Sequence, residues 1–171
     1  MSDLATLLDE TLDAWRYTRQ GFIAEAENIP AGDWGFRPTP ENRDVSELVL
    51  HILQAAGMAV GELTIPHGDF SRQGFAAHIR EHAGHLPETA DPGEWLDLLR
   101  RDLEDGVRRI REAGIEIMGH PITQFNGEPA TRLTWFHHHI AHEDYHRGQL
   151  TLYARLTGHV PALTKLMQGN G

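Results

Sequence analysis

The sequence predicts an all-α protein folded as a four-helix bundle. Four long stretches carry apolar residues at the three- and four-residue spacing of amphipathic helices. Proline and glycine residues mark the loops between these stretches, and no convincing set of alternating strands accompanies them. The sequence contains no repeat, low-complexity segment or linker, so residues 1–171 are expected to form a single domain.

The first two helices have recognisable boundaries. The first is expected over about residues 2–28, because its apolar residues follow helical spacing until Pro30 ends it. A loop rich in glycine and proline comes next. The second helix is expected over residues 44–63, where Asp44 followed by Glu47 has the pattern of a capping box.

Residues 75–86 are expected to add a short extra helix between the second and third helices of the bundle. The third helix begins at the Asp-Pro-Gly-Glu sequence of residues 91–94. This sequence supplies an N-cap, a proline at the first helical position and an acidic residue in the first turn. The helix should extend to about Ala113, with Gly114 directly after its last turn.

The last third of the chain predicts a loop and then a helix. Residues 115–129 contain several glycines and prolines, so we expect a loop, with a short extended stretch at residues 115–118. The fourth helix is expected over residues 131–157, where Gly158 and then Pro161 end it.

The composition disfavours several classes of partner. The 25 acidic and 15 basic residues give a formal net charge of −10, which argues against a nucleic-acid-binding protein. No apolar run reaches the ~18 residues that a membrane span needs. The N-terminus lacks the features of a signal peptide. We therefore expect a cytoplasmic protein with neither nucleic-acid nor membrane partners.

The chain has 12 histidines and no cysteine. The lack of cysteine excludes disulfides, thiolate metal ligands and a cysteine nucleophile. Any bound metal ion must therefore be held by histidine, aspartate or glutamate. The positions of the histidines are the most informative feature of the sequence.

His142 and His146 lie one turn apart on the predicted fourth helix, which places both imidazoles on one face, close enough to bind one ion. Trp135 and Gln149 share this face. Isolated pairs of this kind also occur on solvated faces or as hydrogen-bonded core histidines. Glu143 completes the letters of an HExxH motif, so a metallopeptidase is a minor alternative, although we expect Glu143 to face solvent.

Histidines on two other helices are also candidates. His51 lies at the flank of the apolar stripe of the second helix, a position that by itself favours an interfacial histidine over a metal ligand. Ala55, one turn later, is small and leaves room for an ion. His78, His82 and His85 share one face of the short extra helix and could form a second metal site, or simply a polar flank.

Further residues of the fourth helix have predicted roles. His138 precedes His142 by one turn and could be a fourth ligand or a residue that supports the ligands. His137 and His139 are expected at the surface. Gly148 costs helix stability relative to alanine, so we expect it to permit close packing of a neighbouring helix.

The stretch HEDYHRGQ at residues 142–149 resembles the HxxxHRGQ signature of the DinB/YfiT-like proteins. A second similarity lies upstream, where the Trp-x-Phe-x-Pro loop of residues 34–38 is followed by Ser-Glu-Leu at residues 46–48 and then by His51. The order of these elements and the chain length match the family over nearly the whole chain.

This resemblance implies a four-helix bundle with up-down-down-up connectivity. It also implies a divalent metal ion, often zinc or nickel, bound by three histidines. Carried over position by position, these ligands are His51, His142 and His146. Members of the family are commonly homodimers, so we expect a homodimer here.

Three neutral imidazoles around a divalent ion leave at least one position open, which is the form of a catalytic metal site. Together with the resemblance, this predicts a metal-dependent enzyme that activates a thiol or a water for reaction with a small-molecule substrate. It would be an S-transferase that uses a low-molecular-weight thiol, or a hydrolase. The alternatives are a metal- or small-ligand-binding bundle without catalysis, and a helical interaction module without metal. Glu143, Asp144 and Glu62 are the nearest candidates for a general acid or base.

Overall fold

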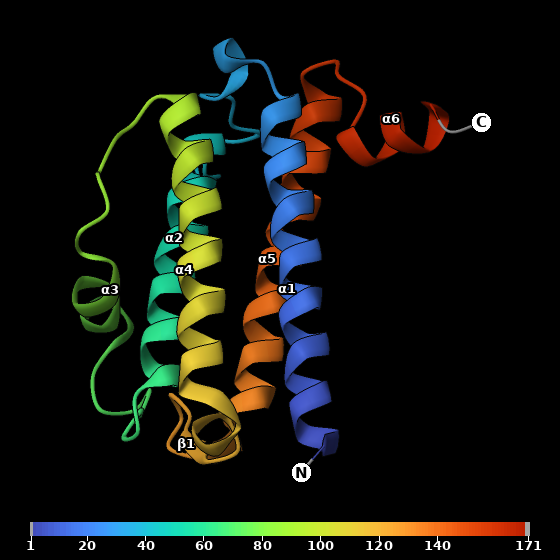
Figure 1. Cartoon of the computed structure of the whole chain (residues 1–171). Coiled ribbons are helices and arrows are strands. Elements are labelled where there is room, and N and C mark those ends of the chain that lie inside the picture. Colours follow the sequence, from blue (N-terminus) through green and yellow to red (C-terminus); the bar gives the residue numbers. More distant parts are fainter. Residues whose placement is uncertain (1, 170–171) are drawn as a thin grey trace.

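The computed structural model describes residues 2–169 and is dominated by four long helices (Figure 1). These helices are α1 (Ser2–Asn28), α2 (Val45–Thr64), α4 (Pro92–Met118) and α5 (Arg132–Leu156). The shorter elements are the 3-10 helix η1 (Ala31–Asp33), α3 (Phe75–Ala83), the strands β1 (Pro121–Thr123) and β2 (Pro129–Thr131), and α6 (Ala162–Gly169). The predicted all-α four-helix bundle is confirmed.

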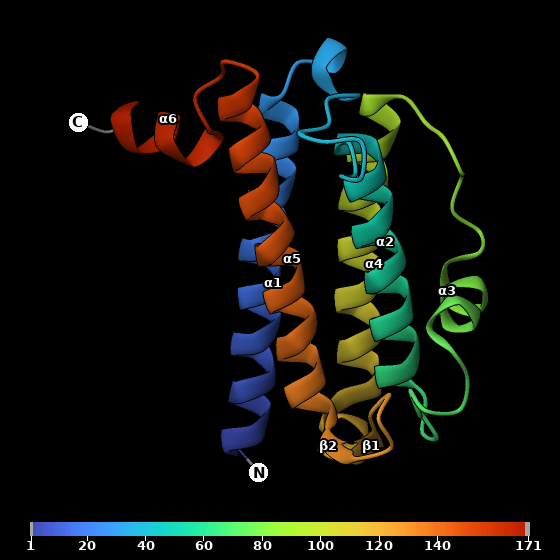
Figure 2. The same ribbon diagram turned by 180° about the vertical axis from the view of Figure 1, so that it is seen from behind.

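The connectivity is up-down-down-up, as predicted. In Figure 1, α1 and α5 run upward while α2 and α4 both run downward. Because α2 and α4 are parallel, the segment that connects the end of α2 to the start of α4 must run back along the whole length of the bundle. Residues 65–91, here called the crossover, make this return on the outside of the bundle and contain α3 (Figure 2).

Local signals in the sequence set the helix ends. The side chain of Asp44 accepts a hydrogen bond from the backbone of Glu47, and the side chain of Glu47 bonds back to the backbone of Asp44, which completes the predicted capping box. Asp91 and Glu94 form the same arrangement at the start of α4. Gly158 has a φ of 84°, the left-handed conformation that ends a helix without cost when the residue is glycine.

Three segments differ from the sequence-based expectations. Residues 115–118 are helical rather than extended: Gly114, with a φ of 68°, redirects the chain, and one further turn follows that buries Met118. Part of the expected loop forms the hairpin of β1 and β2, with Ile122 opposite Ala130. Helix α6, after Pro161, was not predicted; it is only 8 residues long and has no buried residue.

The core has two neighbouring parts. In one, Trp15 packs edge-to-face on Phe136, with ring centroids 5.4 Å apart. In the other, Trp95 and Leu99 of α4 pack with Phe22 of α1. None of the helices within residues 2–169 combines the length and apolar character needed to cross a membrane.

Two tethers fix α2 against α5. At the start of α2, the hydroxyl of Tyr153 donates to the carbonyl of Arg43 at 2.8 Å. At its end, the buried guanidinium of Arg132 donates to four backbone carbonyls, those of Glu62, Leu63, Ile65 and Pro66, at 2.7–3.1 Å. The last carbonyls of a helix have no hydrogen-bond donor within the helix. The Arg132 guanidinium supplies these donors and thereby holds the end of α2 against the start of α5.

Candidate metal centre

Three histidines from two helices bring one ring nitrogen each to a common point. The Nε2 atom of His142 lies 3.1 Å from Nε2 of His51 and 3.1 Å from Nε2 of His146. The three nitrogens lie within 4.8 Å of one another, so a single ion can contact all of them. The structure thus brings together the three positions that the sequence motifs indicated.

The helices explain this convergence. His142 and His146 are one turn apart on α5 and therefore lie on the same face. His51 comes from the second turn of α2, which Tyr153 and Arg132 tether to α5. Of the three rings, His146 is also held on its far side, because its Nδ1 atom lies 2.6 Å from the side-chain oxygen of Gln149.

All three imidazoles favour the neutral form. Burial, reinforced by the positive charge of Arg43 and by the neighbouring rings, lowers the pKa of His51 to about 3. Burial and the proximity of His146 and His139 lower the pKa of His142 to about 4. Burial also lowers the pKa of His146. The site therefore presents uncharged nitrogens at neutral pH, as metal binding requires.

This donor set fits a divalent transition-metal ion. Three imidazole nitrogens face one point, and imidazole is a ligand suited to both zinc and nickel. His51, His142 and His146 would therefore hold the ion, with at least one position left for another ligand.

Glu143 does not belong to this site, and the expectation that it faces solvent is wrong. Its carboxylate is fully buried and turned toward α1, where Arg19 donates from Nε at 2.9 Å and Trp15 donates from Nε1 at 3.0 Å. Burial alone would raise the pKa of Glu143, but the charge and hydrogen bonds of Arg19 hold that pKa well below its usual range. Glu143 is thus a structural anion, which removes the basis for a metallopeptidase of the HExxH type.

Arg19, which pairs with Glu143, also contacts α4. Arg19 also donates from Nη1 to the carboxylate of Asp102 at 2.8 Å and to the carbonyl of Leu99 at 3.1 Å. One buried guanidinium therefore links α1, α4 and α5. Sequence reasoning missed this network, although Arg19 lies one turn after Trp15 on the apolar face of the first helix, a position where a charge needs a partner.

The other histidines of α5 lie outside the cluster. His138 is exposed and packs on Trp135, with ring centroids 5.4 Å apart, so it is not positioned as a fourth ligand. His137 is exposed, as expected. His139 is buried instead of lying at the surface, because its Nε2 atom is 3.0 Å from the carboxylate of Glu143.

A second polar cluster anchors α3 to α2. The buried carboxylate of Glu62 lies 3.1 Å from Nδ1 of His78 and 2.8 Å from Nε2 of His82, while exposed His85 is not part of the group. Glu81 completes a set with metal-like spacing. However, the guanidinium of Arg72 pairs with both carboxylates and supplies the positive charge. His85 lies beyond the end of α3 and does not join this group, so the three histidines His78, His82 and His85 do not form one site.

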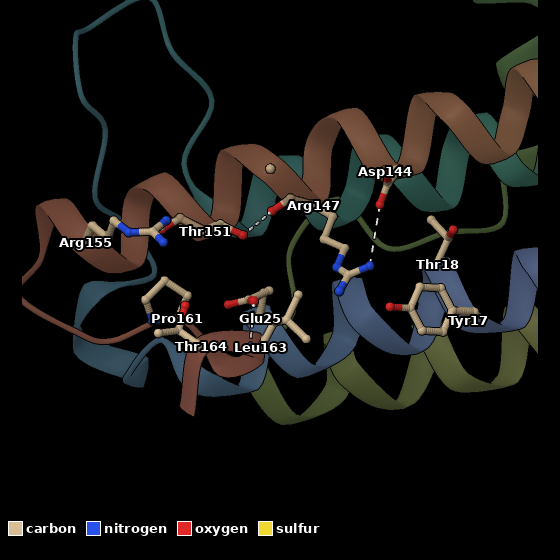
Figure 3. A pocket seen from close by; sticks show the side chains of 11 residues that line it. Tyr17, Thr18, Glu25, Asp144, Arg147, Thr151, Arg155, Pro161, Leu163 and Thr164 are labelled. Atoms are coloured by element: carbon tan, nitrogen blue, oxygen red, sulfur yellow. Dashed lines mark hydrogen bonds and ion pairs between the residues drawn. The ribbon is translucent and has the colours of Figure 1, made fainter. Parts of the chain in front are cut away.

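The remaining residues of the motif divide between two faces of α5. Arg147 reaches away from the histidines toward α1, where its guanidinium lies 5.5 Å from the ring centroid of Tyr17 and against Gly21 (Figure 3). The expectation that Gly148 allows close packing is wrong, since nothing lies within 4 Å of where its Cβ would be. The close approach is made at Gly21 instead, because any side chain there would meet the Arg147 guanidinium.

The fold and the site together define a class: a helical bundle of up-down-down-up connectivity that presents three histidines to one point between α2 and α5. The model of the DinB family matches residues 1–169. The chain belongs to the DinB family.

Solved structures with the same fold agree with this assignment. A DinB-like protein from Bacillus subtilis is 20% identical, with a TM-score of 0.68 over 88% of this chain and 93% of that one. YfiT from the same organism, described as a probable metal-dependent hydrolase with an unusual four-helix bundle topology, is 16% identical. Its TM-score is 0.65, over 89% of this chain and 88% of YfiT.

A mycothiol-dependent maleylpyruvate isomerase shares 13% identity and a TM-score of 0.65 over 84% of this chain, which spans only 60% of that enzyme. No curated protein matches the chain significantly. At these identities the similar structures establish the fold alone.

Proposed function

We propose that this protein is a metal-dependent enzyme in which His51, His142 and His146 bind one zinc or nickel ion and leave a position open for a reacting group. The observation that carries the proposal is the convergence of three neutral imidazole nitrogens within 4.8 Å. An ion bound there would lower the pKa of a thiol or water placed beside it. The description of YfiT as a probable metal-dependent hydrolase supports the same class.

Of the two reactions, transfer involving a low-molecular-weight thiol is the first candidate. The carboxylates that could serve as a base for water are engaged elsewhere: Glu143 with Arg19, and Glu62 with Arg72. Asp144 is exposed and faces Arg147. A thiol needs no such base, because coordination to a metal ion is enough to deprotonate it. The dependence of a structural neighbour on mycothiol supports this choice.

Metal binding is the first test. Protein purified without an affinity tag should bind one equivalent of zinc or nickel, and His51→Ala, His142→Ala and His146→Ala should each abolish tight binding. The control variants are His138→Ala and His85→Ala, which alter exposed histidines and should bind as the parent does. Less than half an equivalent after reloading would contradict the proposal, as would loss of binding in the controls.

Turnover separates the enzyme from a metal-binding protein without catalysis. The metal-loaded protein should conjugate a low-molecular-weight thiol to reactive small molecules, and the His142→Ala variant should not. Hydrolysis of esters or amides without any thiol would favour the hydrolase instead. A fully loaded protein that turns over neither class would leave the non-catalytic alternative.

A further inference from the structure

An apolar cavity adjoins the candidate metal centre. Its volume is about 180 Å³, and its surface is almost entirely carbon. It lies between α2 and α5, and residues from the crossover and from the turn between β1 and β2 complete its walls. Its apolar walls are formed by Met58, Ala59, Phe70, Phe75, Phe125 and Trp135, and His138, His139 and His142 of α5 also line it.

Aromatic rings from three separate segments build one wall. Phe70 of the crossover packs on Trp135 of α5 with ring centroids 4.6 Å apart, and on Phe125 of the β1–β2 turn with centroids 5.1 Å apart. Phe70 is fully buried, whereas Phe125 and Phe75 are partly exposed. The rings therefore line the cavity from its interior to its mouth.

This wall is held in place by backbone and ionic contacts. The amide of Phe70 donates to the carbonyl of Thr123 at 2.9 Å, which joins the crossover to β1. The amide of Asp69 donates to Glu62 at 2.9 Å, and the same carboxylate anchors His78 of α3. A cavity whose wall is fixed by such contacts is preformed, so a ligand need not order it.

The cavity and the histidine cluster share a residue. His142 lines the cavity and also contributes its Nε2 atom to the cluster, and Ala55, one turn after His51, lines the cavity as well. We propose that this cavity binds the apolar part of the substrate, an uncharged group about the size of a single six-membered ring. This inference rests on the proposed function, since it places the reactive end of the substrate at His142.

Size and polarity define the substrate class. A dry cavity of about 150 Å³ accepts benzene in other proteins, so 180 Å³ is suited to one ring or a short branched alkyl group. A charged group would lose its hydration against walls that are almost entirely carbon, which disfavours its binding. Carboxylate-bearing or phosphorylated groups are therefore excluded from this end of the site.

Toluene and benzoate are matched probes, because they share a ring and differ in charge. Binding is followed by NMR through the indole N–H of Trp135 and the methyl group of Met58. Toluene should give saturable shifts at both signals, and benzoate should bind at least about tenfold more weakly. Absence of saturable shifts with toluene, or equal binding of benzoate, would overturn the proposal.

Two variants locate the binding. Ala59→Leu fills the cavity and should weaken toluene binding about tenfold or more. Phe125→Ala removes a partly exposed ring at the mouth that packs on Phe70 but is not itself a buried core residue, so it tests the proposal even if Ala59→Leu does not fold. Ala14→Leu, on an exposed position of α1, is the matched control. If a folded Ala59→Leu or Phe125→Ala variant bound toluene with unchanged affinity, toluene would bind outside this cavity.

The test is separable from that of the proposed function. Toluene binding is measured both after chelator treatment and after zinc loading, and the cavity should bind toluene in both states. Toluene binding by a protein that takes up no zinc on loading would retain the cavity and reject the metal centre. A protein that binds zinc but not toluene would retain the metal centre and reject the cavity as a binding site.

Discussion

The Nδ1 atom of His146 lies 2.6 Å from the side-chain oxygen of Gln149. An amide oxygen only accepts hydrogen bonds, so Nδ1 carries the proton and Nε2 keeps its lone pair. That lone pair points toward the Nε2 atoms of His51 and His142. Gln149 therefore fixes both the tautomer and the orientation of one ligand.

The first prediction concerns Gln149. Gln149→Leu removes the acceptor and should weaken zinc binding about 10–100-fold, the usual effect of losing a partner of a ligating histidine. Competition with a chromophoric chelator measures this. Gln149→Glu keeps an acceptor and should bind zinc at least as tightly as the parent. Equal weakening in both variants would show that the effect is steric.

The second prediction is a pH dependence of the metal-free protein. The pKa values of His51 and His142 are about 3 and 4 when folded, against about 6.5 when unfolded. The unfolded chain therefore binds more protons below pH 6.5, so the free energy of unfolding should fall as the pH drops from 6.5 toward 4. Each ring contributes at most about 1.4 kcal/mol per pH unit, reduced here because both rings are partly solvated.

Urea unfolding with a chelator present, between pH 7.5 and 5.5, tests this slope. The His51→Gln variant lacks the titrating imidazole, so the free energy of unfolding should depend less on pH. His67→Gln, in an exposed loop position, should leave this pH dependence unchanged. With zinc, the rise in melting temperature should be largest near pH 8 and shrink below pH 6.5, because protons and metal compete for the same nitrogens. A shift in melting temperature that is the same at pH 8 and pH 5 would place the ion elsewhere.

The third prediction separates stability from catalysis at Glu143. Glu143→Leu leaves the buried Arg19 short of a counter-charge and should destabilise the fold by about 3–5 kcal/mol, while the folded protein still binds one zinc. The double variant Arg19→Leu/Glu143→Leu should lose less than the sum of the single changes. If a Glu143 variant kept normal stability but lost turnover, Glu143 would instead act as a general base.

The fourth prediction tests the tether between α5 and α2. Arg132→Leu leaves several buried carbonyls at the end of α2 without donors, which should cost about 2–4 kcal/mol in urea unfolding. Arg155→Leu, near the end of α5 and exposed, should cost less than about 0.5 kcal/mol. Similar losses in the two variants would contradict the assigned role of Arg132.

The fifth prediction is the homodimer, which rests mainly on family membership. Leu163, Leu166 and Met167 are exposed on α6, which projects from the bundle in Figure 1. Such apolar side chains are commonly covered by a partner. Light scattering at tens of micromolar should give twice the chain mass, and Leu166→Glu with Met167→Glu should reduce it. A monomer in the parent protein would refute this prediction.

Much of the bundle could be predicted because its signals are local. The capping boxes at Asp44 and Asp91 and the glycine that ends α5, Gly158, act within a few residues of each helix end. The hairpin and α6 could not be predicted in the same way. β1 and β2 are 3 residues each and depend on pairing, and α6 depends on Glu25, whose carboxylate accepts from the amides of Ala162 and Leu163.

The candidate site shows the same division. The spacing of His142 and His146 is a helical repeat and can be read directly from the sequence, whereas His51 was placed only by family resemblance. The environment of Glu143 could not be predicted, because its partners Arg19 and Trp15 lie 124 and 128 residues away. The position of a residue along a helix predicts the face on which its side chain lies. The side chains that it meets on that face depend on how helices distant in the sequence pack.

The crossover has a consequence for how such proteins diversify. The four long helices contact one another directly, so residues 65–91 can change in length or sequence at small entropic cost to the bundle. Those residues nevertheless supply Phe70 and Phe75 to the cavity wall. A lineage with this architecture can therefore change the cavity wall by replacing one surface segment while the three-histidine cluster is inherited intact.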